Sequence, residues 1–203
     1  MISYLIVGIT YGFAAAAQPG PLQTYIISQT FANGWRRTLP ASFSPLISDI
    51  PIIILVLFLL SQLPAWLIQI LHIAGAFFLF YLVYDTYKTW KNFDVNKKRE
   101  VQTNQQTLFK AAVVNFLNPN PYLGWSLVMG PLFLKGYNEA PINGVILIIS
   151  FYATLVAGIA GIIILFAFAR NLGPKIVRIM LGISIVGLAF FGIYQLLLGI
   201  NLV

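Results

Sequence analysis

Six long apolar runs, separated by short polar stretches, dominate the sequence. A helix needs about 20 apolar residues to cross roughly 30 Å of hydrocarbon, and each run reaches that length. The runs cover approximately residues 2–32, 39–60, 66–87, 108–134, 142–169 and 176–200. The pattern therefore predicts an all-α integral membrane protein with six transmembrane helices.

The first and fourth runs contain closely spaced prolines. A proline inside a helix lacks a backbone N–H and frees the carbonyl four residues earlier, so each run should be a broken helix. The half-helix after each break would present unpaired N–H groups and the positive end of its dipole at membrane depth. The proline segments are Gln18, Pro19, Gly20 and Pro21 in the first run, and Asn118, Pro119, Asn120 and Pro121 in the fourth.

The two proline segments occupy corresponding places in two halves of the chain. Because three runs separate them, the halves would enter the membrane from opposite sides, as in the inverted repeats of many secondary transporters. We expect a single membrane domain over residues 1–203, with one repeat at about 1–90, a cytoplasmic basic loop at about 91–107 and a second repeat at about 108–203. The alternative is that the prolines only kink two packed helices.

The charges of the loops predict the orientation, because short cytoplasmic loops collect Lys and Arg. Eleven of the twelve basic residues fall in loops one, three and five, and Lys135 in loop four is the exception. This places both termini outside. No basic residue precedes the apolar run that ends at Ala17, which favours a retained first span over a cleaved signal peptide. The eleven residues are Arg36, Arg37, Lys88, Lys91, Lys97, Lys98, Arg99, Lys110, Arg170, Lys175 and Arg178.

The composition agrees with a membrane protein, because 59% of the residues are hydrophobic and 8% are charged, against about 25% charged in a soluble domain. The net charge of +7 is spread along loops, which indicates lipid headgroups as partners and not nucleic acid. The chain has no cysteine and one histidine, so thiol chemistry and a multi-histidine metal site are excluded. We expect no cofactor, no metal and no enzyme activity.

Asp49 lies near a predicted bilayer centre, about 15 Å into the second run. A carboxylate at that depth is costly unless it is paired, solvated or protonated. We interpret it as a coupling residue, which carries a proton or faces a substrate ammonium; the alternative is a protonated carboxyl that stabilises packing. For His72 a bonded structural role is favoured, and for Asp85 a pairing with Lys88, one turn later.

The residues around the two breaks are candidates for substrate binding. We expect the N–H groups at Leu22 and Gln23, and at Tyr122 and Leu123, to bind a carboxylate, while freed carbonyls and Asp49 receive an ammonium or a proton. The candidate substrate-binding residues are Gln18, Pro19, Gly20, Pro21, Gln23, Asn115, Asn118, Pro119, Asn120, Pro121 and Tyr122, with Asp49 as the coupling residue.

Small residues recur in the later spans and indicate close helix packing, within the bundle or at a homodimer face. They are Gly75, Ala157, Gly158, Gly161, Gly182, Gly187 and Gly192.

Taken together, these motifs resemble the lysine exporter family, the LysE/RhtB-type amino-acid translocators. The chain departs from the family pattern at Asn120, where a basic residue is usual, and in its second span at Ser42 and Pro45. The residues that carry the resemblance are Pro19-Gly20-Pro21, Asn33-Gly34-Trp35-Arg36-Arg37, Ser48-Asp49, Leu71-His72-Ile73-Ala74-Gly75, Tyr81-Leu82 and Asn118-Pro119.

The resemblance implies six spans and a secondary exporter of amino acids or related small solutes, coupled to the proton gradient, in the cell membrane of a prokaryote. The alternative function is a passive channel or an ion or metal permease, although the sequence offers no ring of charges to line a pore. A membrane-embedded hydrolase is disfavoured because the acidic residues offer no pair at catalytic spacing.

Overall fold

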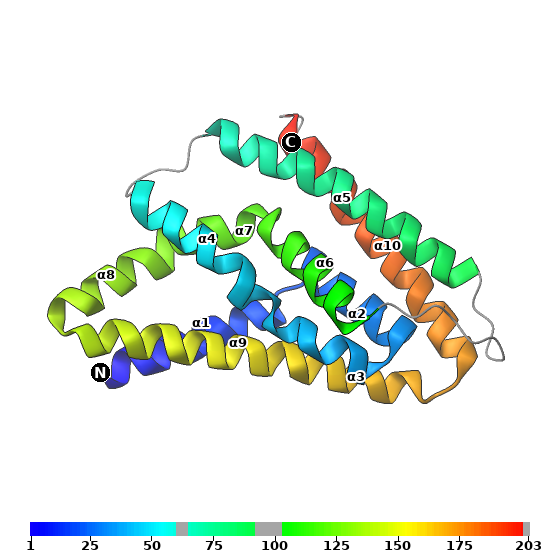
Figure 1. Cartoon of the computed structure of the whole chain (residues 1–203), viewed down its shortest axis with the longest axis horizontal. Coiled ribbons are helices and arrows are strands. Elements are labelled where there is room, and N and C mark those ends of the chain that lie inside the picture. Colours follow the sequence, from blue (N-terminus) through cyan, green and yellow to red (C-terminus); the bar gives the residue numbers. More distant parts are fainter. Residues whose placement is uncertain (60–64, 92–102, 201–203) are drawn as a thin grey trace.

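The computed structural model describes residues 1–59, 65–91 and 103–200, and nearly all of them are helical (Figure 1). A 3₁₀ turn, Leu39–Phe43, precedes α4, and a π-helical turn, Trp125–Met129, joins α7 to α8. The α-helices are α1 (Ile2–Ala17), α2 (Pro21–Asn33), α3 (Trp35–Thr38), α4 (Ser44–Leu59), α5 (Ala65–Lys91), α6 (Asn104–Phe116), α7 (Pro119–Gly124), α8 (Gly130–Glu139), α9 (Pro141–Arg170) and α10 (Pro174–Gly199).

Four apolar helical segments among the described residues are long enough to cross a membrane. They are Trp35–Leu57, Trp66–Lys91, Pro141–Arg170 and Pro174–Gly199. Helix α1 is also apolar but has 16 residues, fewer than the roughly 20 that a straight span requires. The fold is that of an all-α membrane protein.

Both proline segments interrupt their helices, as the sequence predicts. Helix α1 ends at Ala17 and α2 begins at Pro21, while α6 ends at Phe116 and α7 begins at Pro119. Proline is the first residue of each following helix, a position where a backbone N–H would have no helical partner. The local chemistry of proline therefore determines where both breaks fall.

The long helices pack in pairs, in which α1 is parallel to α9 and α5 is antiparallel to α10. Helix α1 lies along α9, and α5 lies along α10 on the opposite side of the molecule (Figure 1). Helices α4 and α6 contact each other between these pairs, and α2 contacts both α9 and α10. This arrangement brings the two breaks together in the interior of the bundle.

Side-chain contacts tie the helices at each end of the bundle. At one end the Tyr4 hydroxyl donates to Glu139 Oε2 over 3.0 Å, and at the other Arg170 Nε donates to the Phe31 carbonyl over 3.1 Å. Figure 1 shows the N-terminus beside the α8–α9 connection, and the α9–α10 connection beside α3. Since α3 contains two arginines, they and Arg170 lie at the same end of the bundle.

Most of the small residues expected at helix contacts do lie against neighbours. A Cβ atom on Gly75 would lie 2.3 Å from Gln195 Oε1, and one on Gly192 would lie 2.9 Å from the Phe80 ring. Gly161 differs from this expectation, because no atom lies within 4 Å of its Cβ position. This glycine faces away from the other helices and is not a packing position.

The third loop is shorter than the expected 91–107, because α6 already begins at Asn104. Thr103 and Gln106 start this helix with a capping box: Thr103 Oγ accepts from the Gln106 N–H over 3.2 Å, and Gln106 Oε1 accepts from the Thr103 N–H over 3.0 Å. This arrangement satisfies N–H groups that the helix leaves unpaired. Residues 92–102 of the expected basic loop lie outside the described residues.

Candidate functional site

The carboxylate of Asp49 lies at a junction of three helices. The side chain is 4% exposed on α4, and each of its oxygens accepts a hydrogen bond. Asn115 Nδ2, in the last turn of α6, donates to Oδ1 over 2.7 Å, and the Tyr152 hydroxyl of α9 donates to Oδ2 over 3.0 Å. These donors offset part of the cost of removing the carboxylate from water.

Asn115 also joins α6 to the backbone of α4. Its Nδ2 donates to Ser48 Oγ over 2.7 Å, and Ser48 Oγ in turn donates to the Ser44 carbonyl over 3.0 Å. Asn115, Ser48 and Asp49 are all buried. Because every member of this network has a partner, it fixes the orientation of the Asp49 carboxylate next to the second break.

A cavity of about 110 Å³ lies between the two breaks and Asp49, large enough for several water molecules. Of the candidate residues, Gln18, Pro19, Gly20, Gln23, Asp49, Asn115, Asn118, Asn120 and Pro121 line this cavity. The remaining lining residues are Tyr11, Ala15, Leu22, Pro45, Gly124, Trp125, Met129, Phe151 and Leu155.

Three candidate residues, Pro21, Pro119 and Tyr122, are buried in α2 and α7 but do not line the cavity. The two prolines begin their helices and so shape the breaks. The Tyr122 side chain is 1% exposed and packs in the main core cluster.

At the first break, α2 has N–H groups without a helical partner. The first helical hydrogen bond runs from the Thr24 N–H to the Gly20 carbonyl over 3.0 Å, which leaves the N–H groups of Leu22 and Gln23 outside the helical pattern. No described side chain caps this helix. These two N–H groups are the ones that the sequence predicted.

One carbonyl freed at the first break, that of Ala15, accepts a hydrogen bond within the protein. Gln23 Nε2 donates to the Ala15 carbonyl over 3.2 Å and to the Ala16 carbonyl over 3.3 Å. The side chain of Gln23 thus bridges the end of α1 to the start of α2. An unpaired buried carbonyl is costly, and this bridge removes that cost at Ala15.

The second break differs from the first, and the expectation of free N–H groups at Tyr122 and Leu123 is wrong. Because α7 already begins at Pro119, these two N–H groups fall inside the helix. The Asn120 N–H is also occupied, since it donates to Asn118 Oδ1 over 3.1 Å. Asn118 therefore caps the N-terminus of α7, whereas the N-terminus of α2 has no side-chain cap.

The sequence patterns did not single out several aromatic residues of the site. Tyr152 donates to Asp49, and the ring of Trp125 stacks on Tyr152 with centroids 6.4 Å apart. Tyr152 lies in the mostly apolar helix α9, whose sequence does not mark which neighbouring helix the Tyr152 side chain meets. For Trp125 there was a signal: it follows Pro121 by four residues, as Tyr25 follows Pro21.

Two other ionisable residues lie outside the cavity. Asp85 pairs with Lys110 of α6 over 2.6 Å, whereas its spacing in the sequence had suggested Lys88. The tertiary contact between α5 and α6 brings a closer partner than the helix itself offers. The Nδ1 atom of His72 is buried and has no hydrogen-bond partner among the described residues.

Two helices broken at membrane depth, whose breaks meet at one polar cavity, form the arrangement found in membrane transport proteins. The chain matches the family of LysE type translocators over residues 13–196 and belongs to this family, which confirms the resemblance. It is thus a multi-pass membrane protein of a transporter family and not of an enzyme family, and membership indicates export of amino acids or related solutes. Comparison with curated proteins and with solved structures gave no match.

Proposed function

We propose that this protein is a secondary active exporter, which moves amino acids or related small solutes out of a prokaryotic cell in exchange for protons. Family membership supports the transport class. The observation that carries the proposal is the cavity in which both helix breaks meet the buried carboxylate of Asp49.

The proposed architecture has six spans in two inverted repeats. The first repeat would comprise the broken helix α1–α2, the span α3–α4 and α5, and the second the broken helix α6–α8, then α9 and α10. A two-fold axis that exchanges the repeats would exchange the α1–α9 contact with the α6–α4 contact and would pair α5 with α10. Contacts of all three kinds support this arrangement.

In the proposed orientation, the end of the bundle that contains α3 and the α9–α10 connection faces the cytoplasm. The arginines at that end support this assignment, because cytoplasmic loops attract positive charge. Both termini would then lie outside, and the apolar faces of the long helices would contact lipid.

The charges that line the cavity favour a zwitterionic or cationic solute. The lining includes one acidic side chain, Asp49, and no lysine or arginine. A substrate carboxylate would bind the N–H groups of Leu22 and Gln23 at the positive end of α2, and its ammonium would face Asp49. These groups lie on different helices, so a bound substrate would connect them.

Protonation of Asp49 would couple the gradient to movement. In the present state both carboxylate oxygens accept hydrogen bonds, from Asn115 and Tyr152. A proton on either oxygen turns that position into a donor. The Tyr152 hydroxyl can turn and accept from a protonated Oδ2, but the Asn115 amide nitrogen can only donate, so a proton on Oδ1 would break its bond and loosen α4 from the break before α7.

The test is efflux from cells preloaded with a panel of labelled amino acids, with and without a protonophore. We expect one or a few amino acids to leave faster when the protein is present, and the protonophore to remove the effect. Asp49→Asn should abolish gradient-driven efflux, while the matched control Glu139→Gln, an exposed acid at the end of α8, should retain it.

Each part of the proposal has its own contrary result. Gradient-independent, non-saturable flux would indicate a passive channel. If Asp49→Asn inserts normally and transports at an unchanged rate across a pH series, Asp49 does not couple protons. No accelerated efflux of any amino acid from a well-expressed protein would contradict amino-acid export.

A further inference from the structure

Tyr25 occupies a special position relative to the cavity. It lies one helical turn after Leu22, which lines the cavity, and its side chain is fully buried at 0% exposure. Its hydroxyl is buried with no hydrogen-bond partner among the described residues. Such orphaned groups are rare in folded proteins because each costs about 1–3 kcal/mol, and each needs an explanation.

The inverted repeat gives Tyr25 a counterpart. Tyr25 follows Pro21 by four residues, and Trp125 follows Pro121 by four residues, so each aromatic ring lies one turn beyond a break. Trp125 lines the cavity and Tyr25 does not. The cavity therefore extends past the second break but stops short of Tyr25, on the side that leads to the proposed cytoplasmic end.

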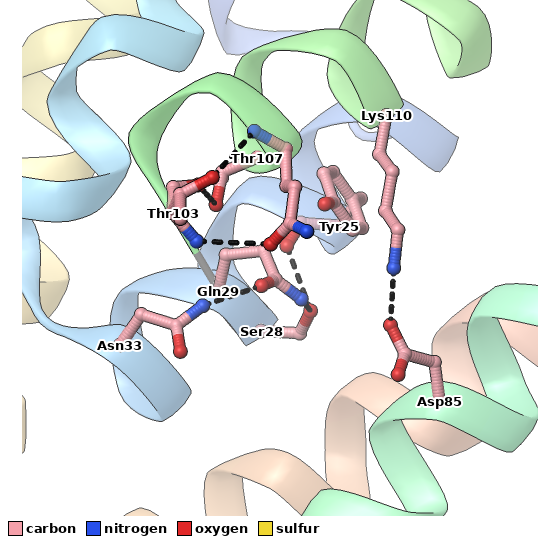
Figure 2. A network of polar contacts seen from close by, with 9 residues as sticks. Tyr25, Ser28, Gln29, Asn33, Asp85, Thr103, Thr107 and Lys110 are labelled. Carbon is pink, nitrogen blue, oxygen red and sulfur yellow. Dashed lines mark hydrogen bonds and ion pairs between the residues drawn. The ribbon is translucent and has the colours of Figure 1, made fainter. Parts of the chain in front are cut away.

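An ion pair joins two helices on that closed side (Figure 2). Lys110 Nζ of α6 lies 2.6 Å from Asp85 Oδ2 of α5, and it also lies 5.1 Å from the ring centroid of Tyr81. Tyr25 belongs to α2, the helix that contacts both helices of this ion pair. Helices α2, α5 and α6 all contact one another here, so the ion pair holds the helices that enclose Tyr25.

Polar side chains are buried beyond Tyr25, toward the C-terminal end of α2. Ser28 and Thr107 are fully buried, and Gln29 is 4% exposed. Ser28 Oγ donates to the Tyr25 carbonyl, and Asn33 Nδ2 donates to Gln29 Oε1, each over 2.7 Å (Figure 2). Both of these bonds lie within α2, whereas polar side chains that hold membrane helices together bond across the contact. The buried polar side chains suit a path that fills with water in another state.

We propose that Tyr25 is the gating residue on this side of the cavity and that the Asp85–Lys110 ion pair holds the gate closed. When α5 and α6 separate, the ion pair breaks, the buried polar groups become hydrated, and Asp85 becomes an acceptor for the Tyr25 hydroxyl. The orphaned hydroxyl is thus explained as a group whose partner exists in the open state. This inference rests on the proposed transport function, because a gate presupposes a cavity with alternating access.

The natural absence of cysteine allows a direct test. Ala15→Cys places one thiol in the cavity, and its reaction with a membrane-impermeant maleimide is followed in vesicles of each orientation. Lys175→Cys, at the start of α10, reports which face is exposed. With an intact gate we expect slow labelling of the Ala15→Cys thiol from the face that labels Lys175→Cys.

Opening the gate should change that rate. Tyr25→Ala and Asp85→Asn, each combined with Ala15→Cys, should speed labelling from this face at least tenfold, and the charge exchange Asp85→Lys with Lys110→Asp should return it toward the starting rate. Tyr84→Ala, which removes an exposed ring from α5, is the matched control and should leave the rate unchanged.

Unchanged labelling in both Tyr25→Ala and Asp85→Asn would overturn the proposal. Asp85→Asn keeps the test valid if Tyr25→Ala does not fold. Labelling needs no substrate and no gradient, so the gate can fail while export holds, and export can fail while the labelling still shows a gate.

Discussion

At the scale of single residues, the most informative feature is how Asp49 is bonded. Neither of its two donors is close to it in sequence: Asn115 precedes the second break, and Tyr152 lies in α9. The hydrogen bonds of the Asp49 carboxylate therefore depend on the relative positions of three helices, α4, α6 and α9. This makes it suited to couple its own protonation to helix movement.

The Tyr152 hydroxyl should contribute measurably to stability. Tyr152→Phe removes a hydrogen bond to an acidic group, which is worth about 1.5–3 kcal/mol when the group is charged. We expect a lower thermal unfolding midpoint in detergent. Tyr194→Phe, on an exposed part of α10, is the control. Equal midpoints for the two variants would mean that the Tyr152 bond contributes little in this state.

At the scale of the elements, the two breaks show how similar proline segments lead to different helix ends. In the first, Gln23 bridges back to the carbonyls of α1 and leaves the α2 N–H groups uncapped. In the second, Asn118 caps α7. The N-cap residue, Gly20 before α2 and Asn118 before α7, therefore decides whether the first N–H groups of the half-helix have a side-chain partner.

Close packing beside the second break should be sensitive to one methyl group. A Cβ on Gly75 would lie 2.3 Å from Gln195 Oε1 and 2.8 Å from the Leu117 carbonyl, which belongs to the break. Overpacking of this kind costs about 1–3 kcal/mol, so Gly75→Ala should lower the unfolding midpoint.

The matched variant is Gly161→Ala, where nothing lies within 4 Å of the added atom. It should keep or slightly raise the midpoint, because alanine is the better helix former by about 1 kcal/mol. A loss in Gly161→Ala as large as in Gly75→Ala would contradict the packing described here.

At the scale of the whole molecule, the ends of the bundle differ in charge and in the contacts that close them. One end has the Tyr4–Glu139 hydrogen bond, and the other has Arg170 bonded to the end of α2. With six spans, the α8–α9 and α9–α10 connections must lie on opposite faces of the membrane.

Single cysteines test this topology. Glu139→Cys should react with an impermeant thiol reagent from outside the cell, and Lys175→Cys should react only after the cytoplasmic face is exposed. The chain's lack of other cysteines makes the signal specific. Reaction of both from one face would contradict the inverted repeat.

Local chemistry was enough to predict the long helices and the two breaks. Long apolar runs have no stable alternative to helix in a membrane, because each backbone polar group must be bonded internally. A proline interrupts a helix wherever it lies. These features depend on near neighbours in the chain, so the sequence by itself determined them.

The partners of the polar groups were decided by the tertiary structure. Tyr152 could not be matched to Asp49, nor Lys110 to Asp85, because the sequence of a helix does not mark which neighbouring helix each of its side chains meets. The sequence also does not show that Gly75 lies against a neighbouring helix while Gly161 does not. Which side chains meet is set by how whole helices pack, and that depends on the complete bundle.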